Sequence, residues 1–518
     1  MASLLFLDQR NFFGSDISLS HLLEPEDLCY VIKDEIAPLI KDSDFEDMYK
    51  DGGRPPISPR LLVLVLMMQF LEGLSDRAAA RNLKFRLDWK IAFELRVEFA
   101  GIHPSTLTHF RDRLIANEAA SYAFDRILEH LTRKGLIKAN GKQRIDSTHI
   151  VGFVRELSRI ELLHETLRLF SQDVGAYKSE MDKNLLTHQE KYVDKVSTYR
   201  MTDADKKFAI QQSGLAMKAF QIWANTTPAG EEVRALNSFK ILNIVFEQNF
   251  IDKASDPELI KVSTGKGHIC SPHEREAEYA NKGKKGWIGY KAQVAETVND
   301  DGKQNFITHI ELTAATNFDG DCVESVINDL ESKQIMPSEL YGDTHYNTCN
   351  NIKILESKAV DLKGEVMPVS NAKATKDLGF EIRLEENKAL CPMGIESKFF
   401  RHKPNGTVSA SFPKQACMQC LRQEICQPEK RGKIYIQRPT NATLDQRRKQ
   451  LEDPVYRKDL NHRNGIEGTI SGLVRGQKLR RCRYRGKAKG QLQTKMSGAA
   501  ANVMRLHIHR QREIRVCA

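Results

Sequence analysis

The segment from Arg463 to Lys495 constrains the fold of this chain more than any other stretch. Asn464 is a suitable helix N-cap and Glu467 follows three residues later, which is the spacing of a capping box. Apolar residues then recur at helical spacing, at Ile466, Ile470 and Leu473. The pattern predicts an amphipathic helix whose apolar stripe packs inward and which carries Glu467 on a neighbouring face. On spacing alone, Glu467 could also be a simple capping carboxylate.

A dense basic run follows this helix. Between Arg475 and Arg515 the sequence contains 13 lysines and arginines and a single acid, Glu513. The net charge of the whole chain is +10, so the basicity is concentrated in this run and the remainder is slightly acidic. Cations at this density repel one another unless a polyanion neutralises them, so the run predicts a phosphate-binding surface, with Tyr484 available to stack on a base. A solvated basic surface is the alternative.

Length and composition exclude several classes of protein. The chain of 518 residues has room for about two to three domains, and 41% hydrophobic with 28% charged residues is an ordinary globular balance. The longest apolar run, Leu61 to Met68, is far shorter than the about 20 residues that cross a bilayer. The N-terminus lacks the basic start and apolar core of a secretion signal. We therefore expect a cytoplasmic protein with no membrane partner, whose ten cysteines form no disulfide framework.

The N-terminal sequence predicts a group of short helices. A turn rich in glycine and proline, between Gly52 and Pro59, leads into a buried helix from Leu61 to Leu74. Ser75 is positioned to cap a second helix, Asp76 to Leu83, and a third begins at Pro104. Short helices joined by tight turns suit a helix-turn-helix DNA reader, although most small helical bundles bind no DNA.

Two aspartates stand in segments with strand patterns. Asp146 lies in the segment Gln143 to Val151, where alternation places it on the same face as Thr148. An aspartate inside a strand is disfavoured and usually has a partner, although an edge-strand position facing water is the simpler explanation. Asp343 ends a short buried strand, Leu340 to Asp343, and a carboxylate there lies where open α/β sheets bind ligands. Both aspartates are candidates for a functional site.

The remaining segments alternate between helical and strand patterns. A mostly helical insertion with no legible function extends from residue 155 to about 250. The other expected elements are a helix Phe124–Leu136, a strand Trp287–Glu296, a turn Asn299–Gly302, a strand Phe306–Leu312, a helix Asp319–Leu330 and a strand Gly364–Val369. The order strand, hairpin, helix, strand, helix matches a ribonuclease H-like core.

Four of the ten cysteines are grouped: Cys391, Cys417, Cys420 and Cys426. Their spacing, C-x25-C-x2-C-x5-C, supplies the four ligands of a tetrahedral structural zinc site. Cysteines that bind no metal are the alternative, and nothing in the sequence indicates the redox role of an iron–sulfur cluster.

A further set of motifs is spread along the chain: Gly53–Pro55, Ser75–Arg77, His103–Thr106, Ile145–His149, Gly289–Lys291, Tyr341–Asp343, Gly465–Ser471 and Arg483–Gly486. Together they resemble bacterial insertion-sequence transposases, in the branch of the insertion sequence four-like superfamily numbered eleven eighty-two. The resemblance covers most of the chain except the helical insertion.

The resemblance implies an α+β multidomain fold, in which a helical N-terminal DNA-binding domain precedes a ribonuclease H-like mixed-sheet catalytic core with a helical insertion and a Cys-rich insertion. The expected domains are 1–120 (helical, binding DNA ends), 121–154 (start of the core), 155–285 (helical insertion), 286–370 (core), 371–440 (zinc-ribbon-like insertion) and 441–518 (glutamate helix and basic C-terminal segment).

The resemblance also implies the catalytic residues. Asp146, Asp343 and Glu467 match the two aspartates and the glutamate of the family, which hold a pair of Mg²⁺ ions, or Mn²⁺, for in-line displacement at phosphorus. The family has an arginine four residues before the glutamate, where this chain has Arg463. It has a lysine seven residues after the glutamate, a position next to Arg475 here.

The DNA-contacting residues that we expect are Arg463, Arg475, Arg480, Arg481, Arg483, Tyr484, Arg485, Lys487 and Lys489. Leu460 departs from the family, which has a tyrosine at that position. His149, His345 and Asp319 lie near the candidate aspartates in sequence, but a histidine next to a strand end is more often structural, and we assign them no role.

The sequence therefore predicts a DNA transposase that binds the ends of its own element, cleaves there with Mg²⁺ and joins the freed 3′ ends to target DNA. Because two ends are handled together, we expect a homodimer on DNA, in the nucleoid-associated cytoplasm of a bacterium. Two alternatives stay open: a non-catalytic DNA-binding regulator derived from a transposase, and a ribonuclease H-like nuclease that cuts without joining.

Overall fold

The computed structural model of the chain describes residues 23–24, 26–49, 56–154, 157–194, 201–251, 257–259, 265–283, 285–299, 303–370, 378–439 and 441–517. The chain divides into two compact units. The first comprises Met1–Pro337 together with Gly465–Ala518, and the second comprises Ser338–Asn464. The C-terminal segment therefore folds with the N-terminal part of the chain and not with the residues that directly precede it.

Short helices open the first unit. They are α1 (Leu28–Tyr30), η2 (Val31–Ile36), η3 (Ala37–Leu39), η4 (Asp42–Met48), α2 (Pro59–Leu71), α3 (Asp76–Phe85), α4 (Leu87–Ala92), α5 (Pro104–Ala116) and α6 (Tyr122–Arg133). The expected helices near residues 61, 76, 104 and 124 are confirmed. The expected cap of the second is also confirmed, because the Ser75 hydroxyl accepts from the amide of Ala78. The expected entry turn lies largely outside the described residues.

An antiparallel sheet forms the centre of the first unit. Its strands are β1 (Lys142–Val151), β4 (Glu278–Lys282), β5 (Lys285–Val298) and β6 (Ile307–Ala314). β5 pairs with β1 along one edge and with β4 and then β6 along the other, and Asp146 lies opposite Val294. The expected strand is confirmed, but burial along β1 does not alternate strictly: Gln143 to Ile145 and Thr148 are buried, whereas Asp146 and Ser147 are both partly exposed. The expected turn after Asn299 lies outside the described residues.

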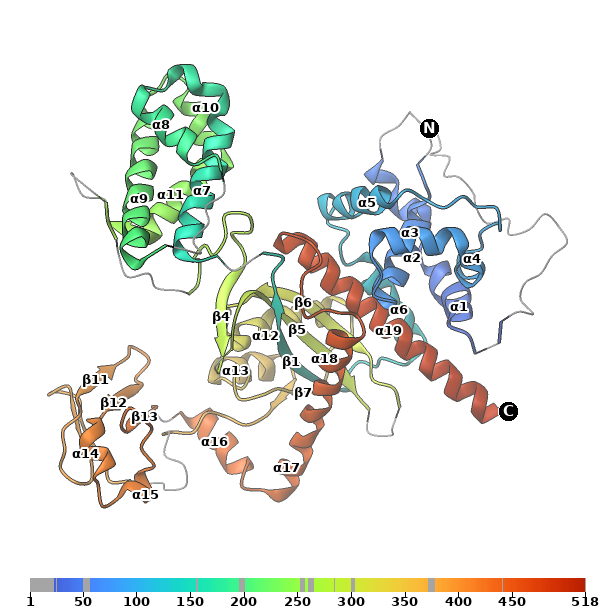
Figure 1. The fold of residues 1–518 in the computed structure, drawn as a ribbon. Coiled ribbons are helices and arrows are strands. Elements are labelled where there is room, and N and C mark those ends of the chain that lie inside the picture. The colour runs from blue at the N-terminus through green and yellow to red at the C-terminus, as the bar shows by residue number, and fades with distance from the viewer. Residues whose placement is uncertain are drawn as a thin grey trace. The chain divides into compact units, whose positions relative to one another are not determined.

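The long helix α19 (Lys487–Cys517), drawn red in Figure 1, packs on β6 and on the N-terminal helices α2 and α6. It completes the hydrogen bonding of the outer strand, because the Asn502 side-chain amide donates to and accepts from the backbone of Ile307. Gly498 allows α19 to approach β6 closely, because a Cβ at this position would lie 2.8 Å from Ile310 Cγ2. Neither α19 nor any other helix in the described ranges has both the length and the apolar content needed to cross a membrane.

The expected helical insertion is confirmed and has a core of its own. It consists of α7 (Arg159–Asp173), η5 (Val174–Glu180), α8 (Lys183–Lys191), α9 (Asp203–Thr226), α10 (Gly230–Ala235) and α11 (Asn237–Asn249), followed by the short strands β2 (Phe250–Ile251) and β3 (Glu258–Leu259). Aromatic residues, including Phe170, Phe220 and Phe239, pack at its centre. After β6, the expected helix forms as η6 (Asp319–Cys322) and α12 (Val323–Ser332).

The second unit begins with a small parallel α/β arrangement. β7 (Glu339–Tyr341) pairs in parallel with β8 (Asp361–Lys363), and α13 (Cys349–Ser357) connects them. The strand expected at Gly364–Val369 is wrong, because pairing stops at Lys363. A Cβ at Gly364 would lie 2.2 Å from the Gly342 carbonyl oxygen, so the backbone there is pressed against the end of β7 and leaves the ladder. α16 (Ala442–Gln450) and α17 (Pro454–Asp459) complete this part.

The Cys-rich segment of the second unit is built from short strands. β9 (Glu381–Arg383) pairs with β10 (Lys388–Leu390), and β11 (Phe399–His402), β12 (Val408–Ser411) and β13 (Ile434–Gln437) form an antiparallel sheet. Two short helices, α14 (Lys414–Met418) and α15 (Gln423–Cys426), lie between β12 and β13. The buried apolar residues among the described residues of this segment are Leu378, Ala389, Val408, Ala410 and Phe412, of which Ala389, Ala410 and Phe412 form one cluster. This core is small for a segment of this length.

Replacing Gly498 by valine tests the packing of α19. The added side chain would meet Ile310 and the ring of Phe124, which is 3.0 Å from the Cβ position, so we expect overpacking to lower the free energy of unfolding by about 1 to 3 kcal/mol. Urea denaturation followed by circular dichroism measures the change. Gly175→Ala is the matched control, since nothing lies within 4 Å of that Cβ position. An unchanged midpoint for Gly498→Val contradicts the close helix–sheet contact.

Candidate active site

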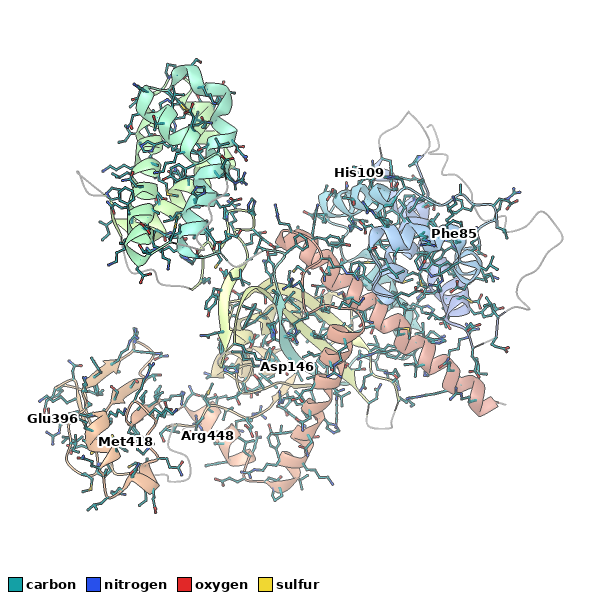
Figure 2. The ribbon with its side chains drawn as sticks, in the orientation of Figure 1. Phe85, His109, Asp146, Glu396, Met418 and Arg448 are labelled. Atoms are coloured by element: carbon teal, nitrogen blue, oxygen red, sulfur yellow. The ribbon has the colours of Figure 1, made fainter. Side chains whose placement is uncertain are left out.

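Asp146, labelled in Figure 2, lies in the middle of β1, the strand that pairs with β5 and contacts α18. Its side chain is partly exposed, while Ile145 before it is fully buried. One carboxylate oxygen, Oδ1, accepts a hydrogen bond of 2.7 Å from the amide of Ser147. The strand therefore presents a carboxylate, already oriented by the backbone, at the surface of the first unit.

Glu467 lies in the first turn of α18 (Ile466–Arg475) and is exposed. The expected cap at Asn464 is wrong: residues 460–465 already turn as a 3-10 helix, η7 (Leu460–Gly465), so the N-cap is Gly465 and no side chain caps the helix. The expected inward stripe is confirmed for Ile466 and Leu473, which are buried. The third buried member of α18 is a polar residue, Thr469.

Thr469 is buried because it belongs to a charged network around Glu296. The Glu296 side chain on β5 has no exposed surface, and its carboxylate accepts from Arg144 Nε at 2.7 Å, from Arg505 Nη1 at 2.8 Å and from Thr469 Oγ1 at 2.5 Å. Arg505 also donates to Thr469. A buried carboxylate with this many donors is stable only while all of them stay in place.

This network ties together the two elements that carry the candidate carboxylates. Arg144 lies two residues before Asp146 on β1, and Thr469 lies two residues after Glu467 on α18. Glu296 bridges them and also binds α19 through Arg505. The distance between strand and helix is therefore set by three hydrogen-bonded side chains and not by apolar packing alone. Sequence reasoning missed this network; the available signal was a pair of opposite charges, Arg144 and Glu296, inside two expected strands.

The network also accounts for Gly465. A Cβ at this position would lie 2.1 Å from Nη1 of Arg144, whose guanidinium is fixed by its bonds to Glu296. A larger residue would push the guanidinium out of the network. Gly465 is the position directly before α18, so the helix begins as close to β1 as the backbone allows.

Asp343 lies in the second unit, two residues beyond the end of β7, so the strand is shorter than the sequence predicts. Its Oδ1 accepts from the amide of His345 at 2.8 Å, and the carboxylate is 30% exposed. The backbone carbonyl of Asp343 also accepts from the side-chain amide of Asn347 at 2.9 Å. A tight turn thus fixes the direction of this carboxylate.

Asp343 lines a cavity of about 680 Å³ within the second unit. Three basic residues lie on the same lining, Lys363, Arg457 and Arg463, together with the acid Glu365. Lys363 is held by Asp459 at 2.8 Å and Glu339 at 3.1 Å. Burial lowers the pKa of Lys363, but hydrogen bonds to these two carboxylates outweigh it and the pKa is raised. The cavity therefore has both cations and carboxylates on its lining, with Arg463 on its wall.

The hydroxyl oxygen of Tyr341 lies 2.5 Å from Glu339 and 3.0 Å from Asp459, so its single proton can be donated to either of the same two carboxylates. Burial raises the pKa of Tyr341, and the two acids raise it further. Asp459 also lies 3.6 Å from His462, next to Arg463. Through this chain of contacts, the segment that carries Arg463 is anchored to β7.

The expected DNA-contacting residues fall into two groups in the first unit. One group makes internal contacts: Arg480 Nη1 donates to the His149 carbonyl at 2.6 Å, Arg483 Nη1 donates to the Leu74 carbonyl at 2.8 Å, Lys489 pairs with Asp112 at 2.7 Å, and the Arg111 guanidinium lies 4.5 Å from the Tyr484 ring centre. The other group is exposed: Arg475, Arg481, Arg485 and Lys487. Tyr484 is partly buried and already has a cation on one face, which leaves little of its ring for the expected stacking on a base.

The backbone of the same segment extends the sheet. The Val151 amide donates to the Arg480 carbonyl at 2.9 Å and the Cys482 amide donates to the Val151 carbonyl at 2.8 Å, which forms a parallel bridge at the end of β1. The segment after α18 is therefore held to β1 by its main chain and to the N-terminal helices by its side chains.

The four grouped cysteines all line one small cavity of about 30 Å³ in the second unit. Cys417 Sγ accepts from the amide of Lys433 and Cys420 Sγ from the amide of Arg422, each at 3.4 Å. Burial raises the pKa of Cys426. Among the residues that the structure describes, no three His, Cys, Asp or Glu side chains are placed to hold a metal ion, so the expected zinc set is gathered in one place but not closed around an ion.

The fold and these sites define a mixed α/β protein with a helical N-terminal region, exposed carboxylates and a basic C-terminal segment. The chain matches the family model "Transposase DDE domain" over residues 390–507 and the model "Transposase domain (DUF772)" over residues 17–113. The first match contains Glu467 and the grouped cysteines, and the second contains α2 and α3. These matches support the function of a DNA transposase, an enzyme that cuts and transfers DNA.

No curated protein matches the chain significantly. Among solved structures, it is similar to a piggyBac transposase synaptic complex with hairpin DNA, determined by cryo-EM. The identity is 11%, the match covers 94% of this chain and 75% of that chain, and the TM-score is 0.32.

Replacing Glu296 by glutamine tests the buried network. The amide cannot balance two guanidinium groups, so we expect the free energy of unfolding to fall by about 3 to 5 kcal/mol, as for other buried ion pairs that lose one partner. Urea denaturation measures the loss. Glu311→Gln is the matched control, because that acid on β6 is only partly buried and accepts from the Ser325 hydroxyl. Equal losses for the two variants contradict a special role of Glu296.

Proposed function

We propose that this transposase uses Asp146, Asp343 and Glu467 as its catalytic carboxylates. The observation that carries the proposal lies in the first unit, where Asp146 and Glu467 are both accessible and stand on elements that Glu296 ties together. Asp343 is assigned through the motif Tyr341–Asp343 and through its position on a cavity with basic walls.

The donor chemistry of this set fits Mg²⁺ or Mn²⁺, because carboxylate oxygens are the protein ligands that these cations prefer. A pair of such ions, when bound, would polarise the attacking oxygen and neutralise charge on the leaving oxygen of an in-line displacement. The chain's own residues hold the DNA: Arg463 and Arg457, on the wall of the cavity with Asp343, bind phosphate oxygens. The attacking oxygen belongs to water during cleavage and to the freed 3′ hydroxyl during joining.

The finer classification also belongs to this proposal. The core is of the ribonuclease H-like type, in the branch of the insertion sequence four-like superfamily numbered eleven eighty-two, with the domain boundaries that the sequence predicts. The support is the chain order of the described elements: antiparallel β1, β5 and β6, then α12, then the short strand β7. The protein acts as a homodimer on DNA, since two element ends are processed together, in the nucleoid-associated cytoplasm of a bacterium.

We propose in addition that Cys391, Cys417, Cys420 and Cys426 bind one structural zinc ion. The support is that all four line the same cavity, that backbone amides already point at two of the sulfurs, and that the apolar core of this segment is small. Segments with so little apolar core usually depend on metals or disulfides for stability. The exposed cations of the basic segment, Arg475, Arg481, Arg485 and Lys487, contact DNA phosphates.

A cleavage assay tests the catalytic assignment. The protein is incubated with Mg²⁺ and a labelled duplex that carries the DNA bordering its own coding gene, and nicked and joined products are separated on denaturing gels. We expect Asp146→Asn, Asp343→Asn and Glu467→Gln each to lower the cleavage rate by about three orders of magnitude or more, with binding retained. Glu386→Gln, at an exposed acid of the second unit, is the control.

The products separate the alternatives. Nicks without joined strands support a nuclease, and binding without nicks supports a non-catalytic regulator. Cleavage by any of the three variants at the wild-type rate removes that residue from the catalytic set.

Metal analysis of the purified protein tests the zinc site. We expect one zinc per chain, lost in Cys417→Ser together with a lower unfolding temperature, because the thiolate is a ligand that serine does not replace. Cys349→Ser is the control, since Cys349 lies outside the cavity and contacts Asn441. A folded wild-type protein without zinc contradicts the site.

A further inference from the structure

The helix α3 has one buried and one basic face. Its buried residues are Ala79, Ala80 and Leu83, which pack towards α2 and α5. Its exposed residues include Arg77, Arg81 and Lys84, which follow one another at steps of four and three residues and therefore share one side of the helix. α3 follows α2 after a turn of only a few residues, which is the arrangement of a helix-turn-helix pair.

The basic face of α3 is not neutralised by the acids around it. Within the described ranges no acid forms an ion pair with Arg77, Arg81 or Lys84, whereas the nearby acids are taken by other cations. Asp76 pairs with Arg111 at 2.6 Å. Arg86, just beyond α3, pairs with both Glu72 and Asp88. Three cations without an acidic partner on one side of a ten-residue helix form a positive surface that suits a polyanion.

An exposed aromatic ring continues the same surface. Phe85, labelled in Figure 2, lies at the C-terminal end of α3. Its side chain is 67% exposed, and the ammonium of Lys84 lies 5.3 Å from its ring centre. Leu87 next to it is 42% exposed. Apolar side chains beside cations suit the grooves of DNA, where they meet thymine methyl groups and sugars while the cations meet base edges and phosphates.

The segment after α18 is attached to the turn that precedes α3. Arg483 Nη1 donates to the Leu74 carbonyl at 2.8 Å and its guanidinium lies 4.9 Å from the ring centre of Phe70, while Lys478 Nζ donates to the Gly73 carbonyl at 3.3 Å. The inward-facing cations of this segment thus bind the helix-turn-helix turn. The exposed cations Arg481, Arg485 and Lys487 belong to the same stretch of chain, so they add positive charge to the compact unit that contains α3.

The neighbouring helix α5 lacks such a face. Its exposed residues His109, Asp112 and Arg113 are mixed in charge. Asp112 is paired with Lys489, and the Arg113 guanidinium lies 4.4 Å from the ring centre of Tyr49. Among the helices of eight or more residues near this turn, α3 is therefore the one that offers a positive surface.

We propose that α3 is the DNA-reading helix of this protein: it lies in the major groove of the element end with Arg77, Arg81 and Lys84 towards the base edges, while Arg481, Arg485 and Lys487 grip the adjoining phosphates. This inference rests on the proposed function and names its recognition surface. The arginines are the side chains that discriminate guanine best, through paired hydrogen bonds to O6 and N7. The bonds of Lys478 and Arg483 to the turn attach the segment that precedes Arg485 and Lys487 to the start of the reading helix.

Fluorescence anisotropy with two labelled duplexes tests the assignment: the DNA bordering the chain's own coding gene, and a duplex of the same composition in scrambled order. For Arg77→Gln/Arg81→Gln we expect the preference for the bordering duplex to fall by about tenfold or more, with little change on the scrambled duplex. For Arg485→Gln/Lys487→Gln we expect the affinity to fall equally for the two duplexes. We also expect the slope of the logarithm of the binding constant against the logarithm of the salt concentration to become shallower by about two. Lys240→Gln, on the insertion helix α11, is the control.

The outcomes separate this inference from the proposed function. If the wild-type protein prefers and cuts the bordering duplex but Arg77→Gln/Arg81→Gln keeps the full preference, α3 is not the reading helix while the transposase function stands. A wild-type protein that neither prefers nor cuts the bordering duplex overturns both. Guanine N7 methylation interference gives an independent readout: methylation should weaken wild-type binding at defined guanines and have no effect on the arginine variant.

Discussion

The contact on which the first unit depends is the buried carboxylate of Glu296. It accepts from two guanidinium groups and one hydroxyl in a place without water access, so each donor is needed to balance the others. The partners come from β1, α18 and α19. Asp146 and Glu467 each stand two positions from a member of this network, so the spacing of the two carboxylates is a consequence of one buried charge. Apolar packing alone would permit the helix to slide along the strand, whereas directional hydrogen bonds do not.

The basic C-terminal segment serves the structure as well as the proposed DNA contact. Its inward cations bind backbone carbonyls of the N-terminal helices and the end of β1. The inward cations repel one another little, because each one donates to its own carbonyl oxygen or pairs with its own acid. The result is that the N-terminal helices, β1 and α18 belong to one compact unit, although their segments lie far apart along the chain.

The helices and strands could largely be predicted from local sequence, because capping residues and apolar periodicity act within a few residues. The apolar run after residue 59 and the capping residue Ser75 correctly predicted the helices α2 and α3. Two local predictions failed for local reasons: Asn464 is already inside a helical turn, and Gly364 is pressed against Gly342, where the strand pairing ends. The candidate carboxylates were found through motifs, and their local placement on β1, after β7 and on α18 agrees with the expected elements apart from the shorter strand before Asp343.

The sequence by itself determined which segments form helices and strands, where the chain is basic, and which acids stand in strand or helix positions that suit chemistry. Only the tertiary structure decided which cations face inward and which remain exposed, and that Arg144, Glu296, Thr469 and Arg505 meet. Arg144 and Glu296 are 152 residues apart, and Glu296 and Arg505 are 209 apart. Periodicity reports only the near neighbours of a residue, so a charge inside an expected strand can be noticed in the sequence but its distant partners cannot be identified from the local pattern.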